Sequence, residues 1–463
     1  MANIIGLLDI GKSALLVHQQ SINVTGHNIA NVNTPGYTRQ RVNLAANSPL
    51  DSSPGQMGDG VVAVNIQRVY DRYINARINT EQQGLGRWEA QKSAMQNLEV
   101  VFDEAGGYGL DRIMTEFWSA WQELSNSPSG YTERVSLVSK SETLAWAFNK
   151  TAADLQQQRV DLDAVIQGGV DEINALASEI ADLNRKIGEI ETGPQNANDL
   201  RDRRDLLVTR LSELADVNTF EDGQGRISVS IGNGRPLVDN AQAWRLGTTT
   251  NAAGHLNVTW IDSSGTAADI TANINGGKLK GWLDVRDGAI TDVLTRLDAM
   301  AANLADAVNA LHTTGYDLYA ALGQAFFSGS TAADIGVNIA VSADPNRIAA
   351  AATAAGAPGD NAIAVAMADL QQAAVMGGGT TSLEDFYRAL VTDVGNQVRA
   401  AADFAEHQSV MMTSLDNHRE SIAGVSLDEE MLNLIKFQHA FDAAAKLVTT
   451  VDQMIQTVMD MTR

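Results

Sequence analysis

The sequence of 463 residues contains no cysteine, which excludes disulfide bonds, cysteine nucleophiles and cysteine metal ligands. Only 8 residues are proline and 5% are aromatic, a composition that favours helices over a β-sandwich. Basic residues are also few, since 33 lysines and arginines accompany 56 acidic residues, and the resulting charge of −23 disfavours nucleic acid as a partner. The sequence has no apolar run long enough to insert into a membrane, and its N-terminus lacks the features of a conventional cleaved signal peptide. We expect an acidic, mainly helical protein of about three domains.

Apolar residues recur with helical spacing at both ends of the chain. Residues 1–38 contain only two charged side chains, Asp9 and Lys12, so the polar face of this helix is almost uncharged. A solvent-exposed helix face normally carries lysine and glutamate, and we therefore expect other protein to surround this helix. At the other end, Ser426 and Glu429 form a candidate capping box that begins a helix of about 35 residues. The candidate packing residues are Leu8, Leu15, Ile22, Leu427, Met431, Leu434, Phe441, Val448 and Ile455.

The middle of the chain predicts a helical region interrupted by strands. Apolar spacing indicates helices over residues 70–216, including two helices joined by a short loop near Gly193 and Pro194. The charged run at 199–205 is interpreted as the solvated face of the second of these helices. Alternating apolar residues and the turn Gly232-Asn233-Gly234 predict a β-rich insertion at 217–285. Helices are expected again at about 283–313 and 382–422, with an irregular stretch between them.

The predicted fold is mainly α with an inserted β domain, and elongated. The terminal helices are expected to pair in an inner coiled-coil layer, with a helical bundle in the middle and the β domain outside. The predicted domains are residues 1–50 plus 415–463, residues 51–216 plus 286–414, and residues 217–285.

A turn follows the N-terminal helix and precedes extended chain. Thr34-Pro35-Gly36-Tyr37 has proline and glycine at the positions that a type II turn requires. The surrounding run NIANVNTPGYTRQRV resembles the N-terminal signature of the axial proteins of the bacterial flagellum, and the run SLDEEMLNLIKFQHAFDAAAKLVTTVDQMIQTV resembles their C-terminal signature. The candidate signature residues are Asn28, Ile29, Asn31, Thr34, Pro35, Gly36, Tyr37 and Arg39.

Segments in the middle narrow this resemblance to one family. GLDRIMTEFWSAWQELSNSP, NDLRDRRDLLVTRLSELADV and ADPNRIAAAA are similar to runs in the first hook-associated protein family. The resemblance implies a structural subunit that forms a homo-oligomeric ring between hook and filament and serves as a template for filament assembly. The implied partners are the hook protein, the second hook-associated protein and an export chaperone of the FlgN type. The implied location is the extracellular flagellum, reached without a cleaved signal peptide.

Two other functions stay open at this point. The first is another axial role, as a hook or rod subunit, which the two-helix segment near residue 193 disfavours. The second is a soluble coiled-coil binding module, which would need charged residues flanking its helix seams. The terminal helices are further expected to be largely disordered in the free protein over residues 1–45 and about 420–463, because weakly charged helices bury little surface in a monomer.

The residues indicate no catalytic or cofactor site. Gly6 to Ser13 matches the spelling of a phosphate-binding P-loop, but this motif requires a preceding buried strand, and only five residues precede Gly6. No two of the seven histidines are four residues apart, so no helical metal pair exists, and we expect them at interfaces or on the surface. Asp161 and Asp163 lie on a predicted helix, where they cannot form a calcium loop. We therefore expect no enzymatic activity, no metal and no cofactor.

Overall fold

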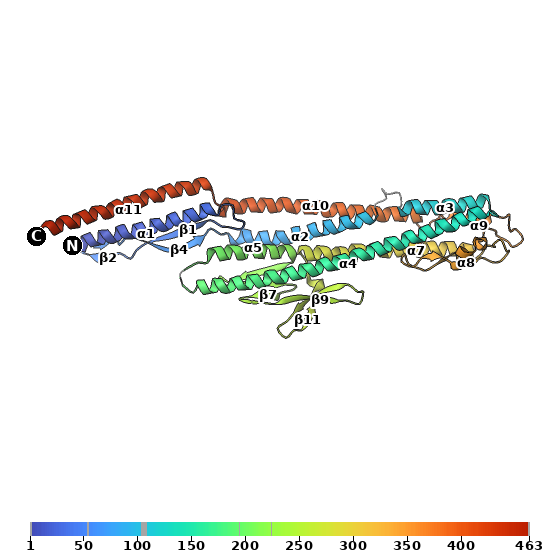
Figure 1. Ribbon diagram of the computed structural model, residues 1–463, viewed down its shortest axis with the longest axis horizontal. Coiled ribbons are helices and arrows are strands. Elements are labelled where there is room, and N and C mark those ends of the chain that lie inside the picture. The colour runs from blue at the N-terminus through green and yellow to red at the C-terminus, as the bar shows by residue number, and fades with distance from the viewer. Residues whose placement is uncertain (1, 53–54, 103–108, 194, 224, 462–463) are drawn as a thin grey trace.

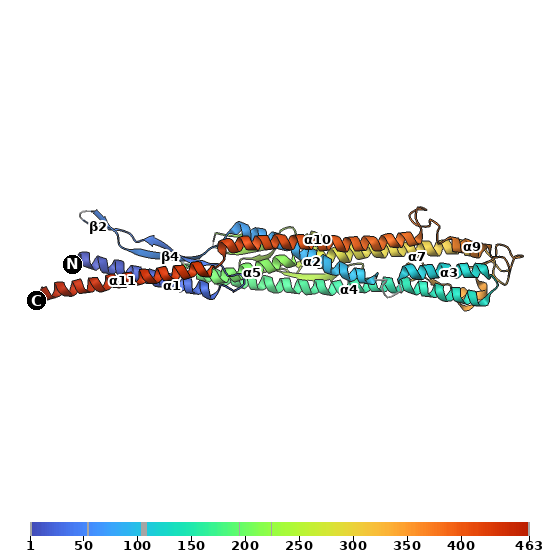
Figure 2. The same cartoon turned by 90° about the horizontal axis from the view of Figure 1, so that it is seen from above.

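The computed structural model describes residues 2–52, 55–102, 109–193, 195–223 and 225–461. These segments form a long rod, with the first and the last helix together at one end (Figure 1). We call this the near end and the opposite one the far end. The view from above shows the same elongation, with the long helices running along the rod (Figure 2).

The near end consists of two paired helices and a β-ribbon. Helix α1 (Ala2–Ala30) packs along α11 (Leu427–Met461), which confirms the predicted pairing of the chain ends. Strand β1 (Gln40–Ala46) pairs antiparallel with β4 (Val61–Arg68), and both strands contact α1. The short strands β2 (Leu50–Ser52) and β3 (Gly55–Met57) extend this ribbon.

Helices, most of them long, form the body of the rod. They are α2 (Arg72–Val101), α3 (Leu110–Asn126), α4 (Tyr131–Ile190), α5 (Asn198–Leu214), α6 (Gly277–Leu283), α7 (Ile290–His312) and α10 (Leu383–Ala423). One turn of π-helix, η3 (Asp284–Ala289), joins α6 to α7. Side chains fix where helices begin: the carboxylate of Asp71 accepts from the backbone of Tyr73 and Ile74 at the start of α2, and Ser382 caps α10.

The predicted β insertion lies on one side of the rod (Figure 1). A four-stranded sheet and a three-stranded sheet compose it, both antiparallel. Their strands are β5 (Val217–Glu221), β6 (Ile227–Ile231), β7 (Arg235–Asp239), β8 (Gln242–Ala243), β9 (Arg245–Thr250), β10 (Leu256–Ile261) and β11 (Ala267–Asp269). The predicted turn connects β6 to β7, where Asn233 and Gly234 have φ of 61° and 85°. A 3₁₀ turn, η2 (Thr271–Asn273), leads back to the helices.

The stretch predicted to be irregular holds short elements at the far end. These are β12 (Phe327–Ser328), β13 (Gly336–Val337), α8 (Ile339–Ala343), η4 (Pro345–Arg347) and α9 (Ala362–Asp369). They pack around the end of α7, where the His312 side chain is fully buried. His255 is only 6% exposed, so the expectation that every histidine lies at an interface or on the surface is wrong for these two.

Buried apolar side chains of the described residues form three clusters along the rod. The largest, the far core, fills the far half around Phe117, Trp121 and Phe326. The second, the middle core, joins the second half of α4 to α5, α6 and the β sheets. A small third cluster lies between the start of α2 and the end of α10, around Ile78 and Leu415. The predicted fold class, mainly helical with an inserted β part, is confirmed, whereas the exact domain limits stay a prediction.

Candidate functional site

The turn that follows α1 is held in place by one buried amide side chain. Asn28 is 1% exposed, and its Oδ1 accepts hydrogen bonds from the Gln40 backbone at 2.9 Å and from the Tyr37 hydroxyl at 2.7 Å. Its Nδ2 donates to the Gln40 carbonyl oxygen at 2.9 Å. The Asn28 side chain therefore pairs with both backbone groups of Gln40 at the start of strand β1, as the backbone of a neighbouring strand would. Burial raises the pKa of Tyr37, and the nearby carboxylates of Asp199 and Asp202 add to this effect, so the phenol stays protonated as a donor.

The geometry of the Pro-Gly segment matches the predicted turn. The Tyr37 N–H donates to the Thr34 carbonyl at 3.1 Å, and Gly36 has φ of +78°. Thr34 in turn donates through its hydroxyl to Oδ1 of Asn31 at 3.1 Å. The turn lies on α5, since a Cβ at Gly36 would be 3.4 Å from Cβ of Leu206. Two further candidate signature residues contribute less, since Ile29 is half-buried and Pro35 is exposed.

A buried carboxylate of α5 receives the chain that leaves this turn. Asp202 is 5% exposed and accepts from the Thr38 backbone at 2.8 Å and from the Thr38 hydroxyl at 2.7 Å. Arg68, at the end of β4, donates to Asp202 at 2.8 Å and pairs with Asp205 at 2.8 Å. Burial raises the pKa of Asp202, and the Arg68 guanidinium and the Thr38 donors oppose that rise without cancelling it.

The interpretation of residues 199–205 as a solvated face is therefore wrong for part of the run. Asp202 is buried as described, and Arg204 is fully buried and donates to Oδ1 of Asn184 at 3.1 Å and to the Gly225 carbonyl at 2.6 Å. Arg201 forms two bonds to Glu191, at 2.8 and 2.6 Å. The reason lies in the tertiary structure, because α5 packs against both the signature turn and the β insertion. Asp202 is paired with the chain that follows the turn, and Arg204 is paired with the β insertion.

Arg39 connects this turn to the C-terminal part of the chain. Its backbone N–H donates to the Ala423 carbonyl at the end of α10 at 2.9 Å. Its guanidinium donates to Glu429 in the first turn of α11 at 2.6 Å. The predicted capping box is thus only half formed, since the Glu429 N–H lies 3.4 Å from Oγ of Ser426 while its carboxylate pairs with Arg39. We call the contacts of Asn28, Thr38, Arg39, Arg68 and Asp202 the terminal joint.

The candidate packing residues of the terminal helices divide into two groups. Leu8, Leu15 and Ile22 of α1, and Leu434, Phe441, Val448 and Ile455 of α11, are half-buried. Leu427 and Met431 are 48% and 55% exposed and lie off the packed face. The candidate packing residues leave out several buried positions of the two helices, among them Val17, Ser21, Val24, Thr25 and Ala444.

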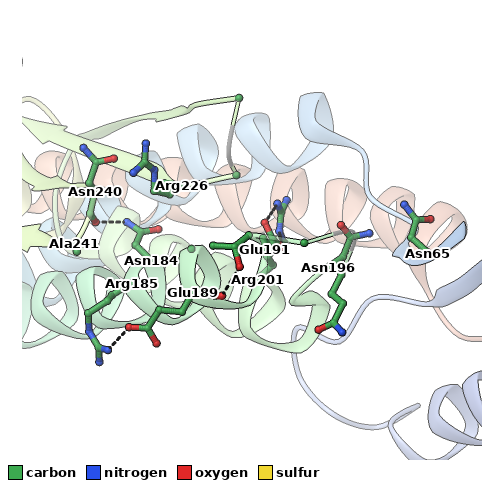
Figure 3. A pocket seen from close by; sticks show the side chains of 16 residues that line it. Asn65, Asn184, Arg185, Glu189, Glu191, Asn196, Arg201, Arg226, Asn240 and Ala241 are labelled. Atoms are coloured by element: carbon green, nitrogen blue, oxygen red, sulfur yellow. Dashed lines mark hydrogen bonds and ion pairs between the residues drawn. The ribbon is translucent and has the colours of Figure 1, made fainter.

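A polar hollow lies beside the terminal joint, between the α4–α5 loop and the β insertion (Figure 3). Its volume is about 830 Å³. Arg201 pairs with Glu191 and Arg185 pairs with Glu189, and Asn184 donates to the Asn240 carbonyl, so these lining groups already satisfy one another (Figure 3). This hollow offers no uncompensated charge for a ligand and holds structural ion pairs.

Other candidate chemistries have no geometric basis in the described part of the chain. Gly6 to Ser13 lies inside helix α1, so its backbone cannot form a phosphate-binding loop. Asp163 is buried against Arg286 and His255, which is a structural pairing. Within the described ranges, no cluster of three or more metal-ligating side chains occurs. Those ranges also contain no helix that is both long and apolar enough to span a bilayer.

The sequence is similar to flagellar proteins along almost its whole length. A family model for the helical domain of the flagellar hook-associated protein FlgK matches residues 95–327. Models for a flagella basal body rod protein and for the C-terminal part of FlgEFG rod proteins match residues 8–38 and 419–461. Flagellar hook-associated protein 1 of Bacillus subtilis is 29% identical over 500 residues, which cover 98% of this chain and 97% of that protein.

Two further comparisons agree with the similarity to flagellar hook-associated proteins. Flagellar hook-associated protein 1 of Escherichia coli is 26% identical, with 98% of this chain and 99% of that protein covered. The structure of the flagellar hook junction protein FlgK from Burkholderia pseudomallei matches 75% of this chain and 100% of that one, with a TM-score of 0.67 and 16% identity. At 16% identity the structural similarity establishes the fold alone, and the relationship to the family rests on the sequence matches.

Proposed function

This chain belongs to the FlgK family of flagellar hook-associated proteins, a structural and non-catalytic family, and we propose that it forms the junction ring between hook and filament. In this role copies of the chain assemble side by side at the end of the hook and present the surface on which the filament grows. The alternatives of a hook or rod subunit and of a free coiled-coil module are disfavoured by the match of the FlgK helical domain.

The exposed apolar face of the terminal helices supports this proposal. Leu432, Ile435 and Met454 of α11 are 69%, 47% and 46% exposed, and Leu16 of α1 is 57% exposed. These side chains lie on two helices that already use their other faces for the α1–α11 contact. The spacing of Leu432, Ile435 and Met454 places them on one face of α11, and large exposed apolar side chains that share a face indicate a protein interface. A ring of identical subunits would cover this face with the same helices of neighbouring copies.

The terminal joint supplies the geometry that such a ring needs. It ties the start of α5, the end of α10 and the first turn of α11 to one turn of the N-terminal segment. We propose that it fixes the angle between the terminal helices and the body, so that the body points in one direction from every subunit. Hook protein would then contact the ring on one side and the second hook-associated protein on the other.

Reconstitution tests the junction role. Purified protein is added to isolated hooks that lack it, followed by the second junction protein, a filament cap and flagellin, and the products are viewed by negative-stain electron microscopy. We expect filaments only when this protein is present. The double variant Leu432→Glu/Ile435→Glu should fail to bind hook ends, whereas Val410→Glu, at a side chain of α10 that is 65% exposed, should bind normally.

Three outcomes would contradict the proposal. Filaments that grow equally well without the protein would remove the junction role. Polymerisation of the protein alone into long curved tubes would favour a hook subunit. Normal binding of the Leu432→Glu/Ile435→Glu variant would show that the exposed face of α11 is not the ring contact.

We further propose that an export chaperone of the FlgN type binds α11 before assembly, and that the chain then reaches the extracellular flagellum through the export channel. The proposed contact is the face around Phe441 and Val448. Because both side chains are half-buried, with Val448 directly against Gly11 of α1, chaperone binding there requires α1 to separate from α11. Aspartate at both positions should abolish chaperone binding in a pull-down, while aspartate at Leu432 and Ile435 should not. Unchanged binding of the first variant would refute this contact.

A further inference from the structure

A groove at the near end of the rod combines apolar walls with charged side chains. It has a volume of about 300 Å³ and lies between the second half of α1, strand β1 and the first turns of α11. We call it the near-end groove, and its lining includes Ser21, Thr25, Val42, Glu430 and Phe437. It borders the terminal joint, because Arg39 of that joint also lines it.

Glu430 is buried in this groove without a partner. The residue is only 3% exposed, at a position of α11 that continues the packed series of Leu434, Phe441 and Val448 towards the start of the helix. Among the described residues, its carboxylate has neither a hydrogen bond nor an ion pair. Glutamate is almost never buried in a folded protein unless it is paired, because an unpaired buried charge is costly. Glu430 therefore lacks a cation that the single chain does not supply.

The groove also presents a free cation at its rim. Arg41 of β1 lines the groove, is exposed, and forms no ion pair with any described residue. The other arginine of the lining, Arg39, is already paired with Glu429 at 2.6 Å. The near-end groove thus offers one free carboxylate, Glu430, and one free guanidinium, Arg41. A partner that satisfies both must carry one charge of each sign.

The outer face of α1 carries such a pair of charges. Asp9 and Lys12 are the only charged side chains of residues 1–38, and both are exposed without an ion pair in the described part of the chain. Side chains three residues apart on a helix lie on the same face, so the two charges are neighbours. Ile5 and Leu16, which are 55% and 57% exposed, share this face by their spacing. We call Ile5, Asp9, Lys12 and Leu16 the outer face of α1.

The outer face and the near-end groove lie on opposite sides of the same helix. Ser21, which lines the groove, follows Lys12 by nine residues, or about two and a half helical turns. The two surfaces are also separated along the rod, because Gly11 packs against Val448, and Glu430 lies about five turns earlier in α11. They therefore cannot meet within one chain. Complementary surfaces on opposite sides of a subunit join identical copies head to tail, and such a contact closes into a ring when the rotation between copies permits.

We propose that the near-end groove of each copy receives the outer face of α1 from a second copy of this chain. In this contact Lys12 of one copy pairs with Glu430 of the next, and Asp9 pairs with Arg41. The exposed Leu16 covers the apolar side chains of the groove. Opposite charges placed this way select one neighbouring surface and one register over others. The inference deepens the proposed junction ring and rests on it, since it names the residues through which neighbouring subunits recognise each other.

Exchange of charges between variants tests this contact in the reconstitution with isolated hooks. Lys12→Glu and Glu430→Lys should each lower the fraction of hook ends that carry protein at least about tenfold, because like charges then meet in the groove. An equal mixture of the two variants should recover binding, since alternating copies restore opposite charges at every contact, and recovery shows that both variants fold. Asp428→Lys is the control, because it removes another carboxylate from the first turn of α11 outside the groove, and it should bind normally. Normal binding of either single variant, or no recovery in the mixture, would overturn the contact.

Cross-linking of the protein without hooks separates this contact from the junction role. Because the chain contains no cysteine, Lys12→Cys/Glu430→Cys carries only two thiols, and each can add across one double bond of a short bismaleimide. Concentrated protein should then give a ladder of dimers and longer chains on a denaturing gel, even if hooks fail to bind the unchanged protein and the junction role is lost. Lys12→Cys/Val410→Cys is the control, since Val410 is exposed on α10 outside the groove, and it should stay monomeric. Equal ladders from both variants, or none from the first, would overturn the contact.

Discussion

Gly11 of α1 lies directly against Val448 of α11, so closely that a Cβ on Gly11 would be 2.7 Å from Cγ2 of the valine. Carbon atoms in van der Waals contact are about 3.5–4.0 Å apart, so a larger residue at position 11 must displace the Val448 side chain or push the two helices apart. This close contact between α1 and α11 therefore depends on glycine, which has no side chain, at position 11.

Gly11→Ala should weaken the pairing of the terminal helices, although alanine is the better helix former. We expect fewer hooks that carry the variant in the reconstitution described above. Gly6→Ala is the control, since a Cβ at Gly6 would meet nothing within 4 Å. The double variant Gly11→Ala/Val448→Ala should recover binding, because the shortened side chain leaves room for the new methyl group. A double variant no better than Gly11→Ala alone would mean that the contact with Val448 is not the cause.

Asp202→Asn should destabilise the terminal joint. The buried Arg68 would keep Asp205 as its only carboxylate partner, and we expect the free energy of unfolding to fall by about 2–3 kcal/mol, somewhat less than when a buried pair loses its single partner. Urea titration followed by circular dichroism measures this change. Asp199→Asn, one turn earlier with a side chain 63% exposed, should cost less than about 1 kcal/mol. Similar losses for both variants would contradict the special role of Asp202.

His312 should make the protein less stable as the pH falls. Burial lowers the pKa of His312 to about 4, and its Nε2 accepts from the Ala349 N–H at 2.9 Å while Nδ1 donates to the Gln324 carbonyl at 2.5 Å. The unfolded chain binds a proton near pH 6.5, so stability present above that pH is lost as the pH falls towards 4. Between pH 7.5 and pH 5 this one group should cost about 2 kcal/mol.

The pH effect is measured as the difference between urea titrations at pH 7.5 and pH 5. His312→Gln should show a difference about 2 kcal/mol smaller than the unchanged protein does, whatever its absolute stability. His418→Gln, at an exposed position of α10, should behave as the unchanged protein. An identical pH dependence for His312→Gln would show that another group is responsible.

Arg134→Lys should be far from conservative. Arg134 is 1% exposed and donates to the Pro128 carbonyl at 3.1 and 2.6 Å and to the Ile348 carbonyl at 2.6 Å. Burial lowers its pKa to about 10, which shows that its surroundings compensate the charge incompletely. A lysine ammonium cannot span both carbonyls in this planar arrangement, and we expect a loss of about 2–3 kcal/mol in thermal or urea unfolding. Arg185→Lys, at a side chain 51% exposed, should leave the stability essentially unchanged.

The terminal segments should gain order on assembly. From the sequence we expect residues 1–45 and about 420–463 to be largely disordered in the free protein, and the half-exposed faces of α1 and α11 indicate how much of their packing needs neighbours. Amide exchange should therefore be fast in both segments of the monomer and slow after binding to hooks. Strong protection of both segments in the monomer would refute this expectation.

The sequence predicted those parts of the fold that local patterns determine. The period of 3.6 indicated the terminal helices and α10, and the alternation of Ile227, Val229 and Ile231 indicated a strand. The turn at Thr34–Tyr37 was predictable because only glycine adopts the required φ at position 36 without strain. These are contacts between near neighbours in the chain.

What the sequence could not predict are the partners of charged residues. Asp202 and Arg204 look like any exposed helix charges, and only tertiary structure brings Thr38 and Arg68 to one and Gly225 to the other. The same holds for Asp163 and Arg286, which are 123 residues apart. In the run TRQRV after the turn, every second residue from Thr38 faces protein, and this alternation indicates a strand that is buried on one side. The sequence does not indicate which segment covers that side.

The bond between Arg39 and Glu429 closes a loop of 390 residues. Loop-closure entropy grows with the logarithm of loop length, and contacts between distant residues form late in folding because closure must come before the contact can contribute. Within the body, α3 packs on α4 and α4 packs on α5, and these contacts between successive helices can form as the chain is made. The pairing of α1 with α11 at the near end of the rod, by contrast, can form only after the final helix has been synthesised. A chain truncated before residue 423 would thus keep most of its body and leave its first forty residues without an anchor on the C-terminal side.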